Sequence, residues 1–128
     1  MDCLSTKSLY HTFAAPDVIK EKFPKYASAN ILSAVFKHTT GDENMSIFDQ
    51  IIFIADFAES GRTYETCKKI RKILDERMIR SKNCNDATEA LNLTMIDTID
   101  AVISTLERLG EKINQRTILT RNSFLSKI

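Results

Sequence analysis

The spacing of apolar and polar residues along this chain is typical of α-helices rather than β-strands. In most segments apolar residues recur three or four positions apart, which places them on one face of a helix. The chain has only 3 glycines and 2 prolines, and they lie between the apolar segments. This scarcity favours long helices. The predicted helices cover residues 14–23, 27–36, 47–58, 64–79 and 87–109, and a last short helix is expected within 117–128. The pattern therefore predicts an all-α fold.

Residues typical of helix ends mark several of these boundaries. Pro16 fits the first turn of a helix that begins near Ala14, because the N–H that proline lacks has no partner there. Pro24 ends the same helix, since it cannot continue it. Ser46 is a good N-cap, and Asp49 three residues later forms a capping box in which Asp replaces the usual Glu. The sequence thus predicts where the first and third helices begin.

The segment 47–58 is the most apolar part of the chain. Apolar side chains cover most of its circumference, and such a helix belongs in the middle of a domain, surrounded by others. A buried strand is the alternative, but the length of the run and its cap favour a helix. The polar residues 80–86 are expected to form a loop. The inward-facing residues of the last two helices are predicted to be Leu91, Met95, Ile99, Val102, Leu106 and Leu109, followed by Ile118, Leu119 and Leu125.

Length and composition suit a single helical domain that spans residues 1–128. Apolar residues make up 43% of the chain, enough for a hydrophobic core, and the net charge is +1. This balance argues against a nucleic-acid partner, which would need a concentrated basic surface. No apolar run reaches the ~18–20 residues of a membrane helix, and no signal peptide is visible. The widely spaced Cys3, Cys67 and Cys84 form no disulfide framework, so a cytoplasmic protein without a membrane partner is expected.

Asp56 is the most informative polar residue, because it lies inside the most apolar predicted helix. A buried carboxylate is costly there unless a metal, a cation or several hydrogen-bond donors compensate for the lost solvation. Two interpretations stay open on these grounds. Asp56 either caps another helix or pairs with an arginine, or it is a metal ligand or a catalytic group.

The two histidines and one arginine are less specific. His38 lies in the last turn of its predicted helix, where the helix dipole favours a cation. His11 precedes a predicted helix and is expected at the surface. From the residues alone, structural roles are favoured for both. Arg62 follows a turn, and its planar guanidinium suits either a phosphate or a surface pair with Glu59.

Three segments carry unusual residues in a characteristic order and spacing. Residues 31–62 read ILSAVFKHTTGDENMSIFDQIIFIADFAESGR, residues 9–15 read LYHTFAA, and residues 117–125 read TILTRNSFL. Together they resemble the bacterial HD-domain symmetrical diadenosine tetraphosphate hydrolases. In that family a helix ends in Tyr-His-Thr-(Thr/Ser)-Gly, and the next contains (Leu/Val)-Ala-Asp-Tyr and closes with Glu-Pro-x-Arg. A histidine segment precedes them, a Thr-x-x-x-x-Asn-x-Leu segment follows, and the likeness covers nearly the whole chain.

The resemblance implies a fold, a metal site and an activity. The fold is an all-helical HD-domain bundle, and the site holds a divalent metal, with iron as the expected ion. Asp56 matches the last aspartate ligand, which we also expect to be catalytic, and His11 and His38 match the two histidine ligands before it. Arg62 is then a candidate for binding substrate phosphates. The implied activity is that of a symmetrical bis(5'-nucleosyl)-tetraphosphatase, a metal-dependent phosphohydrolase that converts a dinucleoside tetraphosphate into two nucleoside diphosphates.

The chain also departs from the family pattern. It contains no His-Asp dipeptide, because the match begins after the family's first histidine-bearing helix and its His-Asp pair. We therefore expect a bundle truncated at the N-terminus, with low activity and with exposed apolar surface around Ile52. The alternatives are a non-catalytic remnant or subunit of a split HD-domain protein, and a helical binding module without a metal. The expected partners are a nucleotide substrate and either a second copy of the chain or a separate N-terminal fragment.

Overall fold

The computed structural model describes residues 6–59 and 64–128, with side chains from Phe13 onward, and these ranges contain helices, turns and loops but no strand. The helices are α1 (Thr6–Lys22), α2 (Ala29–Lys37), α3 (Ile47–Ala58), α4 (Glu65–Arg80), α5 (Cys84–Arg108) and α6 (Gln115–Leu125). A short 3-10 helix, η2 (Pro24–Tyr26), separates α1 from α2. The predicted all-α fold class is confirmed over the described ranges.

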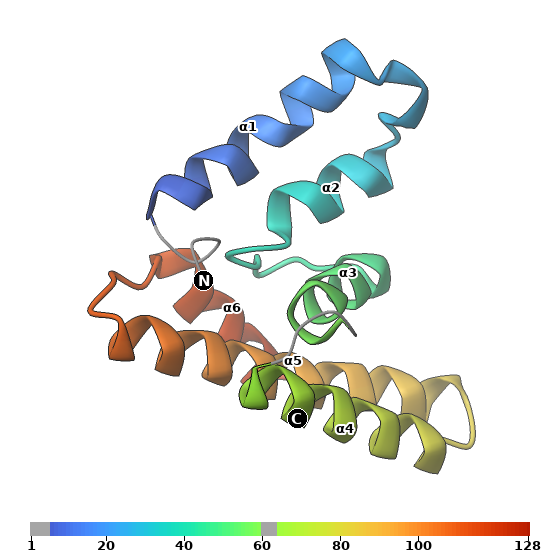
Figure 1. The fold of residues 1–128 in the computed structure, drawn as a ribbon. Helices are drawn as coiled ribbons and strands as arrows, with labels where there is room; N and C mark the ends of the chain where they lie inside the picture. The colour runs from blue at the N-terminus through green and yellow to red at the C-terminus, as the bar shows by residue number, and fades with distance from the viewer. Residues whose placement is uncertain (1–5, 60–63) are drawn as a thin grey trace.

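The central position of α3 organises the arrangement of the helices (Figure 1). α1 and α2 form an antiparallel hairpin, and α2 packs against α3. α4 and α5 form a second antiparallel hairpin, and both of its helices contact α3. α6 packs along α5. α3 therefore lies centrally between the two hairpins, as predicted, but other helices do not surround it, since Ile47, Phe48 and Ile51 are exposed.

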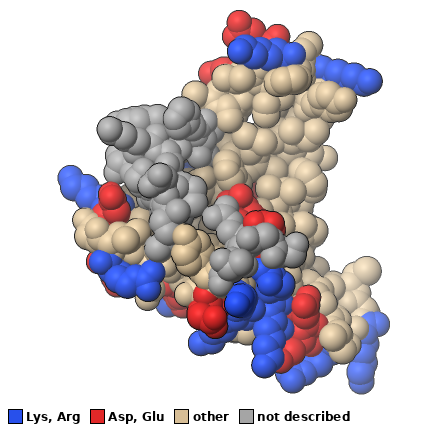
Figure 2. All heavy atoms as spheres, in the orientation of Figure 1, with Lys and Arg blue, Asp and Glu red and all other residues tan. Residues whose placement is uncertain are grey.

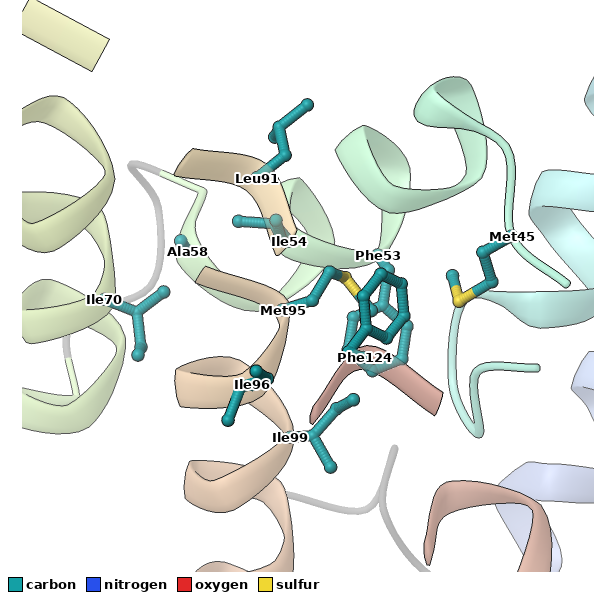
Figure 3. Close-up of a cluster of buried hydrophobic side chains, with 10 residues drawn as sticks. All are labelled: Met45, Phe53, Ile54, Ala58, Ile70, Leu91, Met95, Ile96, Ile99 and Phe124. Atoms are coloured by element: carbon teal, nitrogen blue, oxygen red, sulfur yellow. The ribbon is translucent and has the colours of Figure 1, made fainter. Parts of the chain in front are cut away.

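The hydrophobic core lies where α3, α5 and α6 meet. Phe53 of α3, Met95 of α5 and Phe124 of α6 gather at its centre (Figure 3). Met95 and Phe124 are 0% exposed, and burial of side chains of this size contributes roughly 1.5–3 kcal/mol each. The cluster also contains Met45, Ile54, Ala58, Ile70, Leu91, Ile96 and Ile99. The core thus draws on segments more than seventy positions apart in the sequence, from Met45 to Phe124.

Hydrogen bonds at the start of α3 confirm the predicted capping box. The Asp49 N–H donates to the Ser46 hydroxyl oxygen, and the Ser46 N–H donates to the Asp49 carboxylate. The helix runs from Ile47 to Ala58, as predicted. The side chains of Ser28, Asn83 and Asn114 cap α2, α5 and α6 by accepting from backbone N–H groups.

Two of the predicted boundaries are wrong. α1 already includes Thr6, so Pro16 lies inside this helix rather than in its first turn, and His11 lies within it rather than before it. An internal proline costs a backbone hydrogen bond, and the packing of α1 on α2 outweighs that loss. The loop expected over residues 80–86 spans only 81–83, because the Asn83 side chain accepts from the Asp86 N–H and starts α5 early.

Some of the predicted inward-facing residues lie at the surface. Leu109 is 47% exposed, because α5 has ended and this residue is its C-cap. In α6, Leu119 and Leu125 are exposed, and this helix instead buries Thr117, Thr120 and Phe124. The Thr120 hydroxyl donates to the Arg116 carbonyl oxygen of its own helix, which lets a polar side chain be buried at little cost.

Charged side chains are unevenly distributed over the face of the molecule that Figure 2 shows. In the view of Figure 2, charged side chains gather over the α4–α5 hairpin and at the far end of the α1–α2 hairpin, with a mostly uncharged surface between them. On α3, Ile47, Phe48 and Ile51 are 43%, 40% and 45% exposed. The exposed apolar surface predicted around Ile52 is thereby confirmed for this helix, although Ile52 itself is half-buried. No helix within residues 6–59 and 64–128 combines the length and hydropathy that a membrane span requires.

Candidate functional site

His38 is held in one orientation at the C-terminal end of α2. It is the C-cap of that helix, and its side chain is half-buried. Its Nδ1 atom lies 2.5 Å from the carbonyl oxygen of Val35. Because a carbonyl oxygen only accepts, Nδ1 carries a proton and donates, so the neutral form of the ring has its lone pair on Nε2. Histidines that bind metals commonly show this arrangement, in which a backbone carbonyl orients the other nitrogen.

Asp56 lies in the second half of α3, and its side chain is exposed. The expectation of a buried carboxylate is therefore wrong. The sequence of α3 is apolar around most of its circumference, but α2, α4 and α5 cover only part of it. Since solvent reaches Asp56, the cost of desolvation gives no reason for a compensating metal. Its assignment as a ligand rests on the motif that it shares with the HD-domain hydrolases.

The other two predicted site residues lie partly or wholly outside the described residues. His11 belongs to α1, but its side chain is not among those described, and Arg62 falls in the gap at residues 60–63. Among the described side chains, no three His, Cys, Asp or Glu residues form a group that could hold a metal ion. His38 and Asp56 fit a divalent metal in ligand type, an imidazole nitrogen and a carboxylate oxygen, but not in number. The convergence of His11, His38 and Asp56 stays a prediction.

Asp49, in the first turn of α3, is a buried acid. The sequence pattern predicted it only as part of the capping box. Asp49 is 2% exposed, and its Oδ2 accepts from the Ser33 hydroxyl at 3.1 Å and the Ser46 N–H at 3.0 Å. The Lys37 ammonium lies 3.5 Å from the same oxygen. Because Lys37 directly precedes His38, these contacts fix the end of α2 against the start of α3. The capping pattern located Asp49, but its burial follows from the packing of α3 on α2.

The arrangement of helices identifies the class of protein. The chain matches the crystal structure of a protein from Clostridium acetobutylicum, described as a predicted HD superfamily hydrolase involved in NAD metabolism, with a TM-score of 0.72 and 29% identity. The match covers 92% of this chain and 55% of that one. The fold is therefore that of an HD-domain-like helical bundle, as predicted.

Similarity in sequence indicates which hydrolases within this class the chain resembles. A symmetrical bis(5'-nucleosyl)-tetraphosphatase from Halalkalibacterium halodurans is 30% identical over 96 residues, 75% of this chain and 44% of that protein. A protein of the same name from Bacillus subtilis is 26% identical over 97 residues, 76% of this chain and 45% of that protein. No family model matches the chain. The predicted resemblance is confirmed: the chain is related in sequence and fold to these HD-domain hydrolases, and it spans less than half the length of the two curated relatives.

Proposed function

We propose that this chain forms part of a metal-dependent phosphohydrolase that splits a dinucleoside tetraphosphate symmetrically into two nucleoside diphosphates. The names of both curated relatives support this substrate class. The structural observation that carries the proposal is the orientation of His38, whose Nδ1 donates to the Val35 carbonyl and whose Nε2 remains an acceptor. Because the chain spans less than half of each relative, the proposal concerns the complete site to which these residues would contribute.

In the proposed site this chain supplies ligand atoms and holds them in place. His38 presents Nε2 and Asp56 presents a carboxylate, and we assign His11 as the third ligand. The expected metal, iron, would neutralise charge on the substrate phosphates and make water a better nucleophile. The Val35 carbonyl keeps the ring of His38 from turning. Arg62 is assigned to the substrate phosphates, which match its planar set of donors.

Metal titration followed by thermal melting tests the ligand assignment. A metal that binds the folded chain raises its melting temperature. We expect ferrous or manganous ions to raise the Tm of the chelator-treated wild type and to have little effect on His38→Ala and Asp56→Ala. Asp75→Ala, which removes an exposed carboxylate from α4, is the matched control and should respond like the wild type. A full response from both site variants would refute the assignment.

Product analysis tests the reaction itself. Symmetrical cleavage of diadenosine tetraphosphate yields ADP alone, whereas ATP and AMP would contradict the proposal. We expect slow hydrolysis by the chain alone, because it contains no His-Asp dipeptide, which the family resemblance assigns to the complete metal site. A fast reaction that survives both His38→Ala and Asp56→Ala would place the chemistry elsewhere in the chain.

A second candidate function is that of a subunit whose site is completed by another helical segment. The exposed face of α3 favours it. Ile51 lies one turn after the adjacent Ile47 and Phe48, on the same side of the helix, and all three are at least 40% exposed. A contiguous apolar surface on a central helix is typical of a docking site. We therefore propose that this face packs against a helical segment that carries the remaining ligands.

A binding experiment distinguishes this role from self-association. The chain is mixed with the part of the Halalkalibacterium relative that lies outside the match, and the mass is measured by light scattering after size exclusion. We expect an equimolar complex that Ile51→Lys abolishes. Leu93→Lys, at a similarly exposed apolar position on α5, is the control and should leave the complex intact. A particle of twice the chain's mass without the added segment would instead indicate a homodimer.

A further inference from the structure

A guanidinium lies over two aromatic rings next to the last turn of α2, the helix that precedes His38. Arg116, at the start of α6, has its Cζ atom 4.9 Å from the centroid of the Phe36 ring and 5.7 Å from that of Phe13. The two rings lie 5.3 Å apart. Phe36 is two residues before His38, so the guanidinium is anchored against the last turn of α2.

The hydrogen bonds of Arg116 are incomplete. Its Nη1 atom is buried and has no hydrogen-bond partner. Its ion-pair partner is Asp42, whose Oδ1 lies 4.0 Å from Nε. Asp42 is shared, because it also lies 3.9 Å from the Lys37 ammonium and accepts from the Asn44 N–H. A buried donor without an acceptor is rare in native structures and calls for a physical explanation.

We infer that Arg116 is an anion-binding residue and that its ligand is a phosphate group of a nucleotide. Phosphate oxygens match the fork of guanidinium donors and would supply the acceptors that Asp42 supplies only in part. Contact with the rings of Phe13 and Phe36 holds the guanidinium in place in advance, which lowers the entropy cost of binding. The Arg116 side chain as a whole is 35% exposed, so a ligand can approach the exposed part of the guanidinium from solvent, while the Nη1 atom faces the interior. The inference rests on the proposed function for the class of ligand.

Binding of inorganic tripolyphosphate to the full chain tests this inference. Calorimetry is performed with a chelator present and at constant ionic strength, so that neither a metal nor general screening accounts for the signal. We expect saturable binding to the wild type and at least about tenfold weaker binding to Arg116→Met, which keeps the apolar stem but loses the charge-assisted hydrogen bonds. Arg121→Met is the control on the same helix. Its guanidinium already donates to Asp100, and this hydrogen bond raises the pKa of Arg121.

Two results of this binding experiment would contradict the inference, and a second variant provides an independent test. Equal affinity of the wild type and Arg116→Met, or no saturable binding by the wild type at millimolar tripolyphosphate, would overturn it. If Arg116→Met fails to fold, Asp42→Asn serves instead. This variant removes the competing carboxylate and should bind tripolyphosphate more tightly, and an unchanged affinity overturns the inference. The proposed hydrolase function is tested separately, by metal titration and product analysis.

Discussion

Gly41 packs directly against Thr120: a Cβ atom built on this glycine would lie 2.8 Å from the Thr120 Cγ2 atom. Gly41 also has a φ of +76°, in the left-handed region that other residues rarely adopt. The backbone N–H of Gly41 donates to the Lys37 carbonyl oxygen. Glycine is therefore required here both for its φ and for its lack of a side chain, and the turn after His38 lies tightly against α6.

The first prediction compares the two glycines with positive φ. Gly41→Ala should lower the free energy of unfolding by about 2–4 kcal/mol, because it adds left-handed strain and overpacking against Thr120. Gly110→Ala should cost only about 1–2 kcal/mol, since φ is +70° but no atom lies within 4 Å of the added Cβ. Urea unfolding of both variants provides the measurement. Equal losses would show that the turn does not pack on α6 as described.

The second prediction concerns the capping box of α3. Ser46→Ala should cost about 1 kcal/mol, because one N-cap hydrogen bond is lost. Asp49→Ala should cost about 2–4 kcal/mol, since it removes the acceptor of both the Ser33 hydroxyl and the Ser46 N–H and leaves Lys37 without its buried partner. Thermal and urea unfolding should rank the two variants in this order. The reverse ranking would mean that Asp49 acts only as a cap.

The third prediction separates the two faces of α3. Ile54 is 1% exposed and belongs to the core, so Ile54→Ala should lower the free energy of unfolding by about 2–5 kcal/mol. Ile51 is 45% exposed, and Ile51→Ser should cost about 1 kcal/mol or less. The same unfolding assay on the isolated chain compares them. A large loss for Ile51→Ser would indicate that its face is already covered.

The fourth prediction concerns the proton on His38. Since the Val35 carbonyl accepts from Nδ1, the neutral ring should carry its proton on that atom in the metal-free chain. Long-range nitrogen–proton correlation spectra of the labelled chain, recorded at high pH, distinguish the two tautomers. His38→Ala identifies the signals by their disappearance. A ring protonated on Nε2 would contradict the orientation on which the proposed ligand role depends.

Local signals in the sequence predicted the elements well wherever a side chain acts on its own backbone. Ser46 and Asp49 located the start of α3. Pro16 suggested a helix start near Ala14 that is wrong, because proline only prefers the first turn of a helix. The packing of α1 on α2 allows the helix to continue on both sides of this proline. The periodicity of α5 identified its buried stripe from Leu91 to Leu106, and it failed at Leu109, where the helix ends.

By itself the sequence determined the helical class, the apolar character of α3 and the family to which its motifs point, because these depend on residue type and spacing along the chain. The tertiary structure alone decided which face of each helix is covered. It exposes Asp56, buries Asp49, turns the threonine face of α6 inward and brings Arg116 onto Phe13 and Phe36. These outcomes depend on contacts between segments far apart in the chain, and periodicity shows that a face is apolar without showing what covers it.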